Sequence, residues 1–237
     1  MIAITIPLEP AGRGLGGSKR ATLPLPQCFR EGGQEKKLDG AIPNPKQEWT
    51  AETINALPIR RFEGSVYLVH SDAQVASAAE RLGRERVLGF DTETKPSFAK
   101  GQVNPPAILQ LSSGSEAYLF QLLRLRRLGP VLALLSDPAI LKVGVAPGYD
   151  VRKLQEVYTF EPRGFVDLAT LSSEAGFPAN GLKGLAASLL GFRLSKRAKM
   201  SDWSRPELAP AQISYAATDA WVGREIYMAL ERLRHGA

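Results

Sequence analysis

Short apolar runs follow one another through most of the chain and predict strands separated by helices. Runs at 66–69, 87–90 and 140–145 predict three strands, because about four to eight apolar residues between polar ones are typical of a buried strand. Two further runs, 106–112 and 117–120, flank a Ser-Gly-Ser turn and predict a hairpin. The sheet is therefore expected to contain antiparallel as well as parallel strands.

Helices are predicted where apolar residues recur every three or four positions. Val75, Ala78, Ala79 and Leu82 share one face of a helix that Ser71 or Asp72 would cap. The same period predicts helices at 131–135, 150–158, 166–175, 182–190 and 211–233, and a helical turn at 49–56. Strands alternating with helices indicate an α/β domain with a mixed central sheet flanked by helices.

The first 48 residues show no such period. They are rich in Gly, Pro and charged residues, so they cannot repay the entropy cost of ordering on their own. We expect a disordered or extended segment at 1–48 and one folded domain at 49–237.

Composition narrows the class of protein. The chain has 237 residues and is 44% hydrophobic, which is sufficient for a substantial core. Its net charge of +6 permits an acidic partner such as nucleic acid. Cys28 is the only cysteine, which excludes an internal disulfide framework, and no apolar run is long enough to cross a membrane. A cytoplasmic protein is expected; organelle import is the alternative, because Arg13, Lys19, Arg20 and Arg30 precede the domain.

Two carboxylates follow the apolar run at 87–90. Asp91 and Glu93 are two residues apart, so in an extended chain they point to the same side. Like charges held side by side favour a hard cation with oxygen ligands, such as Mg²⁺ or Mn²⁺. The alternative is that Asp91 marks the end of a strand and Glu93 is solvated.

Three later residues are candidates for the same site. Asp150 follows the strand at 140–145 and could face the crevice beyond the strand ends, although Asp is also a common helix N-cap. Asp219 lies in an apolar helix surface, where a carboxylate is costly unless it is paired or binds a metal. Tyr215 precedes Asp219 by four residues and shares its helix face, either as a hydrogen-bonded core residue or as the group that holds a water.

These residues resemble the motifs of a known family. The similarity is to the four-carboxylate (DEDD) 3′-5′ exonucleases with a motif tyrosine, most closely to the exonuclease domain of the Werner-syndrome helicase and its bacterial relatives, and more distantly to ribonuclease D. It extends over roughly residues 60–235. The motifs that carry it are Phe90-Asp91-Thr92-Glu93, Gly144 with Asp150, Asp202-Trp203-Ser204 and Tyr215-x-x-x-Asp219.

The resemblance implies a ribonuclease-H-like fold and two divalent cations, Mg²⁺ or Mn²⁺. It implies that Asp91 bridges both ions, that Glu93 and Asp219 complete the site that activates water, and that Asp150 reaches the second ion through water. It also implies that Tyr215 orients the attacking water. The expected reaction releases nucleoside 5′-monophosphates from the free 3′ end of DNA or RNA. Family members with a histidine base carry it five residues before the last Asp, where this chain has Ser214.

Basic residues near the motifs are candidates for strand contacts. Lys196, Arg197 and Lys199 match the segment that borders the cleft in relatives, and Lys95 follows the acidic strand. Many relatives carry a bulky residue directly after the motif glutamate, where this chain has Thr94, so the choice between DNA and RNA stays open. A catalytically silent nucleic-acid-binding module or adaptor of the same fold is the alternative function, and internal cleavage of ribonuclease H type is a third.

Overall fold

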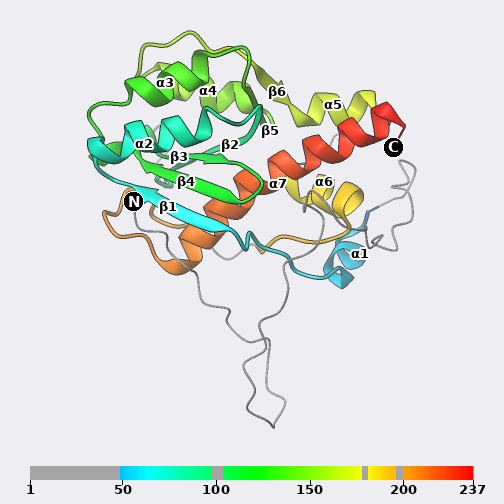
Figure 1. The fold of residues 1–237 in the computed structure, drawn as a ribbon. Coiled ribbons are helices and arrows are strands. Elements are labelled where there is room, and N and C mark those ends of the chain that lie inside the picture. Colours follow the sequence, from blue (N-terminus) through cyan, green and yellow to red (C-terminus); the bar gives the residue numbers. More distant parts are fainter. Residues whose placement is uncertain (1–48, 98–103, 178–180, 196–199, 237) are drawn as a thin grey trace, which may run out of the picture.

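One mixed sheet of six strands organises the chain (Figure 1). The computed structural model describes residues 49–97, 104–177, 181–195 and 200–236. The strands are β1 (Ser65–Val69), β2 (Val87–Thr94), β3 (Pro106–Ser112), β4 (Glu116–Gln121), β5 (Leu141–Gly144) and β6 (Phe165–Asp167). They lie in the order β1-β4-β3-β2-β5-β6, so β2 is a central strand. It pairs antiparallel with β3 and parallel with β5, which confirms the mixed α/β sheet.

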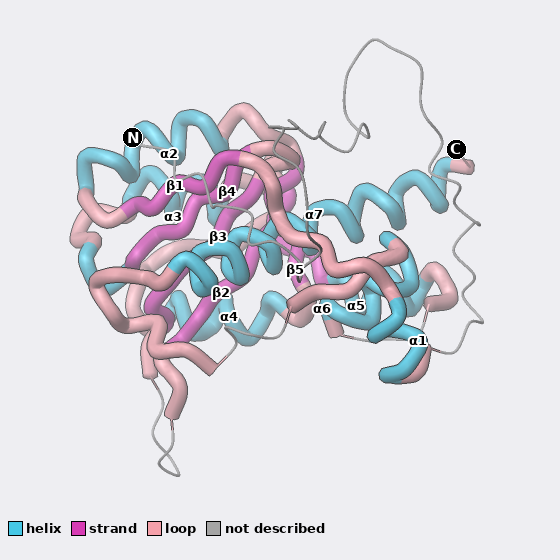
Figure 2. The backbone as a smooth tube through the Cα atoms, turned by 90° about the horizontal axis from the view of Figure 1, so that it is seen from below, coloured by secondary structure: helices cyan, strands magenta, loops and turns pink. Residues whose placement is uncertain are grey.

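Helices cover both faces of this sheet (Figures 1 and 2). They are α1 (Ala51–Ala56), α2 (Asp72–Leu82), α3 (Gly129–Ser136), α4 (Pro147–Gln155), α5 (Leu168–Glu174), α6 (Leu182–Leu185) and α7 (Pro210–His235), with a 3₁₀ turn at Leu122–Arg124 and a π-helical turn at Ala186–Leu190. Helices α2, α3 and α4 pack on one face, and α7 crosses the other. The two faces therefore have separate apolar cores.

Most predicted elements are confirmed, and two helices begin at other residues than predicted. The helix expected at 166–175 begins at Leu168, because residues 165–167 instead form the edge strand β6, parallel to β5. Such a short strand has too few residues for its period to be visible in the sequence. The Asp167 side chain caps α5 by accepting a hydrogen bond from the backbone N–H of Ala169.

Helix α4, in contrast, begins three residues earlier than the sequence predicted. Its first residue is Pro147, whose fixed backbone angle suits the start of a helix, and its N-cap is Ala146. Asp150 is therefore inside the helix, and the interpretation of Asp150 as the N-cap is wrong. Strand β2 runs further than expected and includes Asp91 and Glu93.

Close packing places α7 directly over the central strands. A Cβ atom at Gly89 of β2 would overlap the carbonyl oxygen of Ala220, so only glycine allows α7 to approach this closely. Ala216, Ala217 and Ala220 of α7 are fully buried, and their small side chains permit the same approach. The contact brings the middle of α7 alongside the residues that follow Gly89.

No helix in the described ranges is long and apolar enough to cross a membrane. Residues 1–48 lie outside the described residues, so the division of the chain at residue 48 stays a prediction.

Candidate active site

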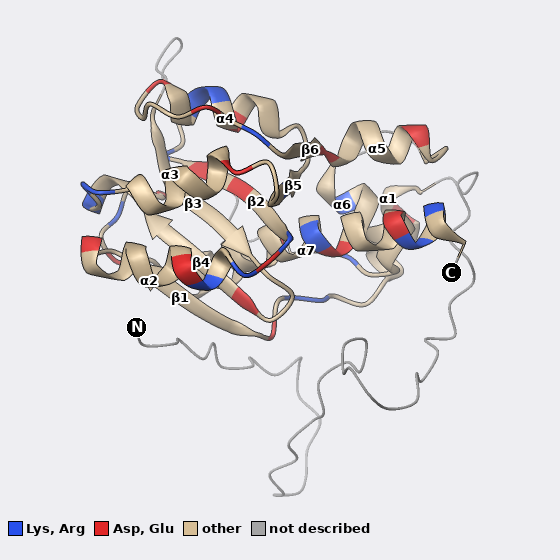
Figure 3. Ribbon diagram, turned by 45° about the horizontal axis from the view of Figure 1, so that its top comes forward, with Lys and Arg blue, Asp and Glu red and all other residues tan. Residues whose placement is uncertain are grey.

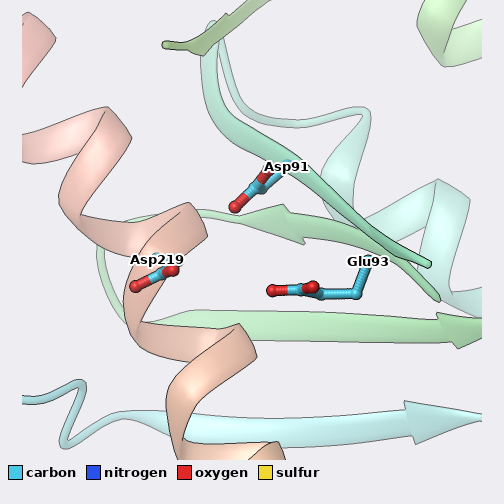
Figure 4. A group of neighbouring side chains, drawn as sticks. All are labelled: Asp91, Glu93 and Asp219. Atoms are coloured by element: carbon cyan, nitrogen blue, oxygen red, sulfur yellow. The ribbon is translucent and has the colours of Figure 1, made fainter. Parts of the chain in front are cut away.

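Three carboxylates meet between β2 and α7. Asp91 and Glu93 alternate with Thr92 along β2 and therefore face the same side of the sheet, where α7 supplies Asp219. One carboxylate oxygen from each residue lies within 4.8 Å of the other two. Figure 4 shows the three side chains pointing toward one another. The sequence pattern predicted the pair on β2, and the crossing of α7 adds the third carboxylate.

The electrostatics of this cluster favour a bound cation. The pKa of the Asp91 carboxyl is raised well above its usual value, first by burial and then by the negative charges of Asp219 and Asp150. The backbone N–H of Thr92 donates a 2.8 Å hydrogen bond to Asp91, which only partly offsets this effect. Ionised carboxylates in such proximity repel one another unless positive charge lies between them. Such hard oxygen donors suit a divalent cation.

Asp150 reaches the site from the opposite face of β2. Its Oδ1 atom accepts a 2.6 Å hydrogen bond from the hydroxyl of Thr92, the residue between the two β2 carboxylates. Burial raises the pKa of Asp150, and the Thr92 hydrogen bond lowers it. Asp150 does not belong to the group of three oxygens, but its charge contributes to the raised pKa of Asp91. The structure therefore places the fourth predicted carboxylate beside the cluster.

Tyr215 stands next to the cluster on α7. Its pKa is raised, first by burial and then by the negative charge of Asp219 and a hydrogen bond to that carboxylate. The phenol therefore stays protonated and acts as a donor, not as a base. The buried indole of Trp203 packs behind it, with ring centroids 6.1 Å apart, and limits how far the tyrosine ring can move.

Two cavities border the carboxylates. One has a volume of about 510 Å³ and extends from Asp91, Tyr215 and Asp219 toward α6 and α1. The other, of about 370 Å³, extends from the same three residues along the end of β2 toward Met200. The carboxylates therefore lie where the two cavities meet.

The basic residues predicted to contact a strand are only partly described. Lys95 is exposed directly after β2. Hydrogen bonds from Ser204 lower the pKa of Asp202, and the positive charge of Lys95 adds a smaller effect in the same direction. Lys196, Arg197 and Lys199 lie outside the described residues. Figure 3 shows Lys and Arg interspersed with Asp and Glu on α2, α4 and α7. The strand contacts of these four residues therefore stay a prediction.

Sequence reasoning missed the roles of two residues. Thr92 was only part of a motif, but its position between two carboxylates in a strand is itself a signal that its hydroxyl faces the other side. Nothing in the spacing of Trp203 from Tyr215 predicts that their rings are in contact.

The fold and the cluster together define a class of protein. A mixed sheet flanked by helices, with carboxylates gathered between its central strand and the helix that crosses it, is the arrangement of a ribonuclease-H-like fold. The chain belongs to the 3′-5′ exonuclease family, whose sequence profile matches residues 66–234. The family resemblance inferred from the motifs is thereby confirmed.

Several curated proteins are similar to this chain. It is 38% identical over 151 residues to exonuclease 3′-5′ domain-containing protein 2 of Drosophila melanogaster, a match covering 62% of this chain and 26% of that protein. It is 33% identical over 187 residues to the mouse bifunctional 3′-5′ exonuclease/ATP-dependent helicase WRN, covering 75% and 13%. Ribonuclease D of Gluconacetobacter diazotrophicus is 32% identical over 171 residues, covering 70% and 42%. The chain thus spans less than half the length of each of these relatives.

Solved structures share the fold. Ribonuclease D of Escherichia coli superposes with a TM-score of 0.66 at 24% identity, covering 72% of this chain and 45% of that one. The EXO domain of Aedes aegypti Nibbler superposes with a TM-score of 0.64 at 24% identity, covering 72% and 89%.

Proposed function

We propose that this chain is a metal-dependent 3′-5′ exonuclease that hydrolyses the phosphodiester bond at the 3′ end of DNA or RNA and releases nucleoside 5′-monophosphates. The observation that carries the proposal is the convergence of Asp91, Glu93 and Asp219, with oxygens within 4.8 Å of one another, in a chain of this family. A nucleic acid with a free 3′ end is the proposed partner.

Each acidic residue has a proposed part in holding two divalent cations, Mg²⁺ or Mn²⁺. Asp91, whose carboxyl senses the negative charges of both Asp219 and Asp150, would be the ligand shared by both ions. Glu93 and Asp219 would help to hold one ion, and Asp150, on α4, would hold the other through a water molecule. When bound, the ions supply positive charge that lowers the pKa of the attacking water and stabilises the developing charge on the phosphoryl oxygens.

The remaining residues position the reactants. The protonated phenol of Tyr215 keeps its hydrogen bond to Asp219 and lines both cavities, so it is placed to orient the water that attacks the phosphorus. The Thr92 hydroxyl fixes the orientation of Asp150. Negative charge on three neighbouring carboxylates would repel a phosphodiester, so strand binding near this site should depend on the cations.

Incubation with end-labelled oligonucleotides tests the proposal. Single strands, recessed duplexes and RNA carrying either a 3′ or a 5′ label are offered with Mg²⁺ or Mn²⁺, and in parallel with EDTA. Stepwise shortening from the 3′ end that EDTA abolishes is the expected result. Internal fragments would indicate cleavage of ribonuclease H type, and binding without cleavage would indicate the silent module.

Two variants complete the experiment. Asp91→Ala is expected to abolish hydrolysis while the protein still folds. Glu161→Ala removes an acid that is 72% exposed and paired with Arg163 on the surface, so it controls for loss of negative charge alone. Equal activity of both variants would contradict the proposed site.

A further inference from the structure

A buried glutamine lies one strand away from the carboxylate cluster. Gln110 belongs to β3 and is fully buried. Neither its amide nitrogen Nε2 nor its amide oxygen Oε1 has a hydrogen-bond partner among the described residues. A buried polar group without a partner destabilises a fold, so such groups are rare in proteins unless they have a further role. Packing of the core alone therefore does not explain a glutamine at this position.

The side chain of Gln110 projects to the face of the sheet that carries the carboxylates. In the antiparallel pair of β2 and β3, Gln110 lies directly opposite Asp91. Residues directly opposite each other project to the same face, with Cβ atoms about 4.5–5.5 Å apart. Ile108, two residues earlier on β3, shares that face and packs in the apolar cluster beneath α7. At this spacing, the amide of Gln110 and the carboxylate of Asp91 are close enough to share one water molecule.

The other neighbours of Gln110 on this face offer its amide no charged group. On β4 it lies opposite Leu119. Two residues along β3, the hydroxyl of Ser112 donates a 2.7 Å hydrogen bond to the carbonyl of Ser113. The side chains of α7 in this cluster are apolar, namely Ile213, Ala216 and Ala217. Among these neighbours, the carboxylate of Asp91 is therefore the strongest acceptor for the amide.

We infer that Gln110 is a positioning residue for Asp91, with its amide N–H linked to the Asp91 carboxylate through one buried water. The two side chains make no direct hydrogen bond, and a water accepts from an N–H group and donates to a carboxylate oxygen. This role rests on the proposed function, in which Asp91 would be the ligand shared by both cations. Hydrogen-bond partners behind a metal ligand fix its orientation and thereby raise metal affinity.

A neutral donor suits this place. The backbone N–H of Thr92 already donates to Oδ1 of Asp91 at 2.8 Å. A second donor from β3 holds the carboxylate from another side, and an ionised carboxylate has enough lone pairs to accept both and still bind cations. A lysine or arginine at position 110 would bring its own positive charge and compete with the cations. The amide of Gln110 therefore orients Asp91 without neutralising it.

Calorimetric titration with Mn²⁺ tests this role without relying on turnover. Gln110→Met has a similar volume but lacks the amide, and it is expected to bind Mn²⁺ about 10- to 100-fold more weakly than the wild type. Gln121→Met is the matched control. Gln121 is a buried glutamine of β4 whose Nε2 donates to the carbonyl of Pro206 at 3.0 Å. Its replacement should lower the unfolding temperature but keep the Mn²⁺ affinity within about twofold of the wild type.

NMR spectroscopy of the wild type provides a second measurement, which does not depend on any variant being folded. The side-chain NH₂ resonances of Gln110 should shift when Mg²⁺ is added, because the cations draw on the carboxylate to which the amide is linked. The NH₂ resonances of Gln121 should stay in place. Unchanged Gln110 resonances at saturating Mg²⁺ would count against the link to Asp91.

Two outcomes distinguish this role from the proposed function. Gln110→Met with wild-type Mn²⁺ affinity and a raised unfolding temperature would show that Gln110 is an unpartnered core residue. That result would overturn the inference, and 3′ shortening of oligonucleotides by the wild type would still stand. Conversely, Mn²⁺ binding that depends on Gln110, in a wild type that cleaves no oligonucleotide, would support the inference and contradict the exonuclease.

Discussion

The hydroxyl of Thr92 donates a 2.6 Å hydrogen bond to the carboxylate of Asp150 and thereby links β2 to α4. Thr92 lies between Asp91 and Glu93, so the side chains of successive residues of one strand contact groups on opposite faces of the sheet. Strand β2 therefore carries two of the carboxylates, Asp91 and Glu93, and positions a third, Asp150, through the side chain of Thr92.

Thr92→Val is expected to weaken cation binding. The substitution keeps the shape of the side chain but removes the hydrogen bond that holds the pKa of Asp150 down, so that pKa should rise further. Loss of such an orienting contact typically costs about 10- to 100-fold in metal affinity or activity. The Mg²⁺ concentration that gives half-maximal activity should therefore be higher in the variant than in the wild type. Thr92→Ser keeps the hydroxyl and should restore the wild-type value; an unchanged value for Thr92→Val would show that Asp150 needs no such partner.

Cations should stabilise the fold more strongly at higher pH. The pKa of Asp91 is higher in the folded protein than in the unfolded chain, so the folded state binds more protons between the two values. The stability of the cation-free protein should therefore fall as pH rises from the unfolded pKa of 3.8 through the folded one. Unfolding temperatures measured with EDTA and with Mg²⁺ at several pH values should differ, and this difference should grow as the pH rises. In Asp91→Asn, which cannot ionise, the difference should grow less.

Tyr215→Phe is expected to lower kcat without changing the pH profile. Burial and Asp219 keep the phenol protonated, so its ionisation cannot produce a limb of the rate profile at or below pH 10. Removing the hydroxyl deletes a hydrogen bond to Asp219, and a fall of about 10- to 100-fold is expected. Rates measured from pH 6 to pH 10 provide the check. If the wild type alone showed an alkaline limb that the variant lacked, Tyr215 would have to act as an acid or a base.

Gly89→Ala is expected to disrupt the contact between α7 and β2. The added methyl group would overlap the carbonyl oxygen of Ala220, so the helix must shift or the protein must lose about 3 kcal/mol of stability or more. Asp219 is adjacent to Ala220, so activity should fall as well. Denaturant unfolding measures the change. Gly148→Ala is the matched control, because a methyl group there meets nothing within 4 Å and its stability should change by less than about 1 kcal/mol.

Lys142→Met should alter how stability depends on pH. Lys142 is fully buried in β5, and its Nζ donates to the carbonyls of Leu134, Asp137 and Ile140 at 3.0, 2.7 and 2.6 Å. Burial lowers its pKa from 10.5 to about 8, so the folded state binds fewer protons than the unfolded chain between these values. Lys142 therefore contributes a rise in stability from about pH 8 to pH 10.5. The free energy of unfolding should rise less with pH in Lys142→Met than in the wild type. If it rose equally in both proteins, the lowered pKa of Lys142 would be contradicted.

Much of the fold could be predicted because local periods determine which face of an element is buried. The alternation in β2 placed Asp91 and Glu93 on one side, and the helical period placed Tyr215 beside Asp219. Strand β6 could not be predicted, because three residues are too few to show a period. These residues form a strand only because they pair with the neighbouring β5. The burial of Lys142 was also hidden, because its partners are carbonyls that the fold gathers around it.

The sequence by itself determined the acidic pair, the motif tyrosine and the elements that carry them. Only the tertiary structure decided that Asp219 meets that pair, that Thr92 holds Asp150, and that Gln110 is buried opposite Asp91. The physical reason is that a short-range period sets the direction of a side chain relative to its own backbone. Distances between residues far apart in the chain depend instead on strand order and on how closely a helix can cross the sheet, as α7 does over Gly89.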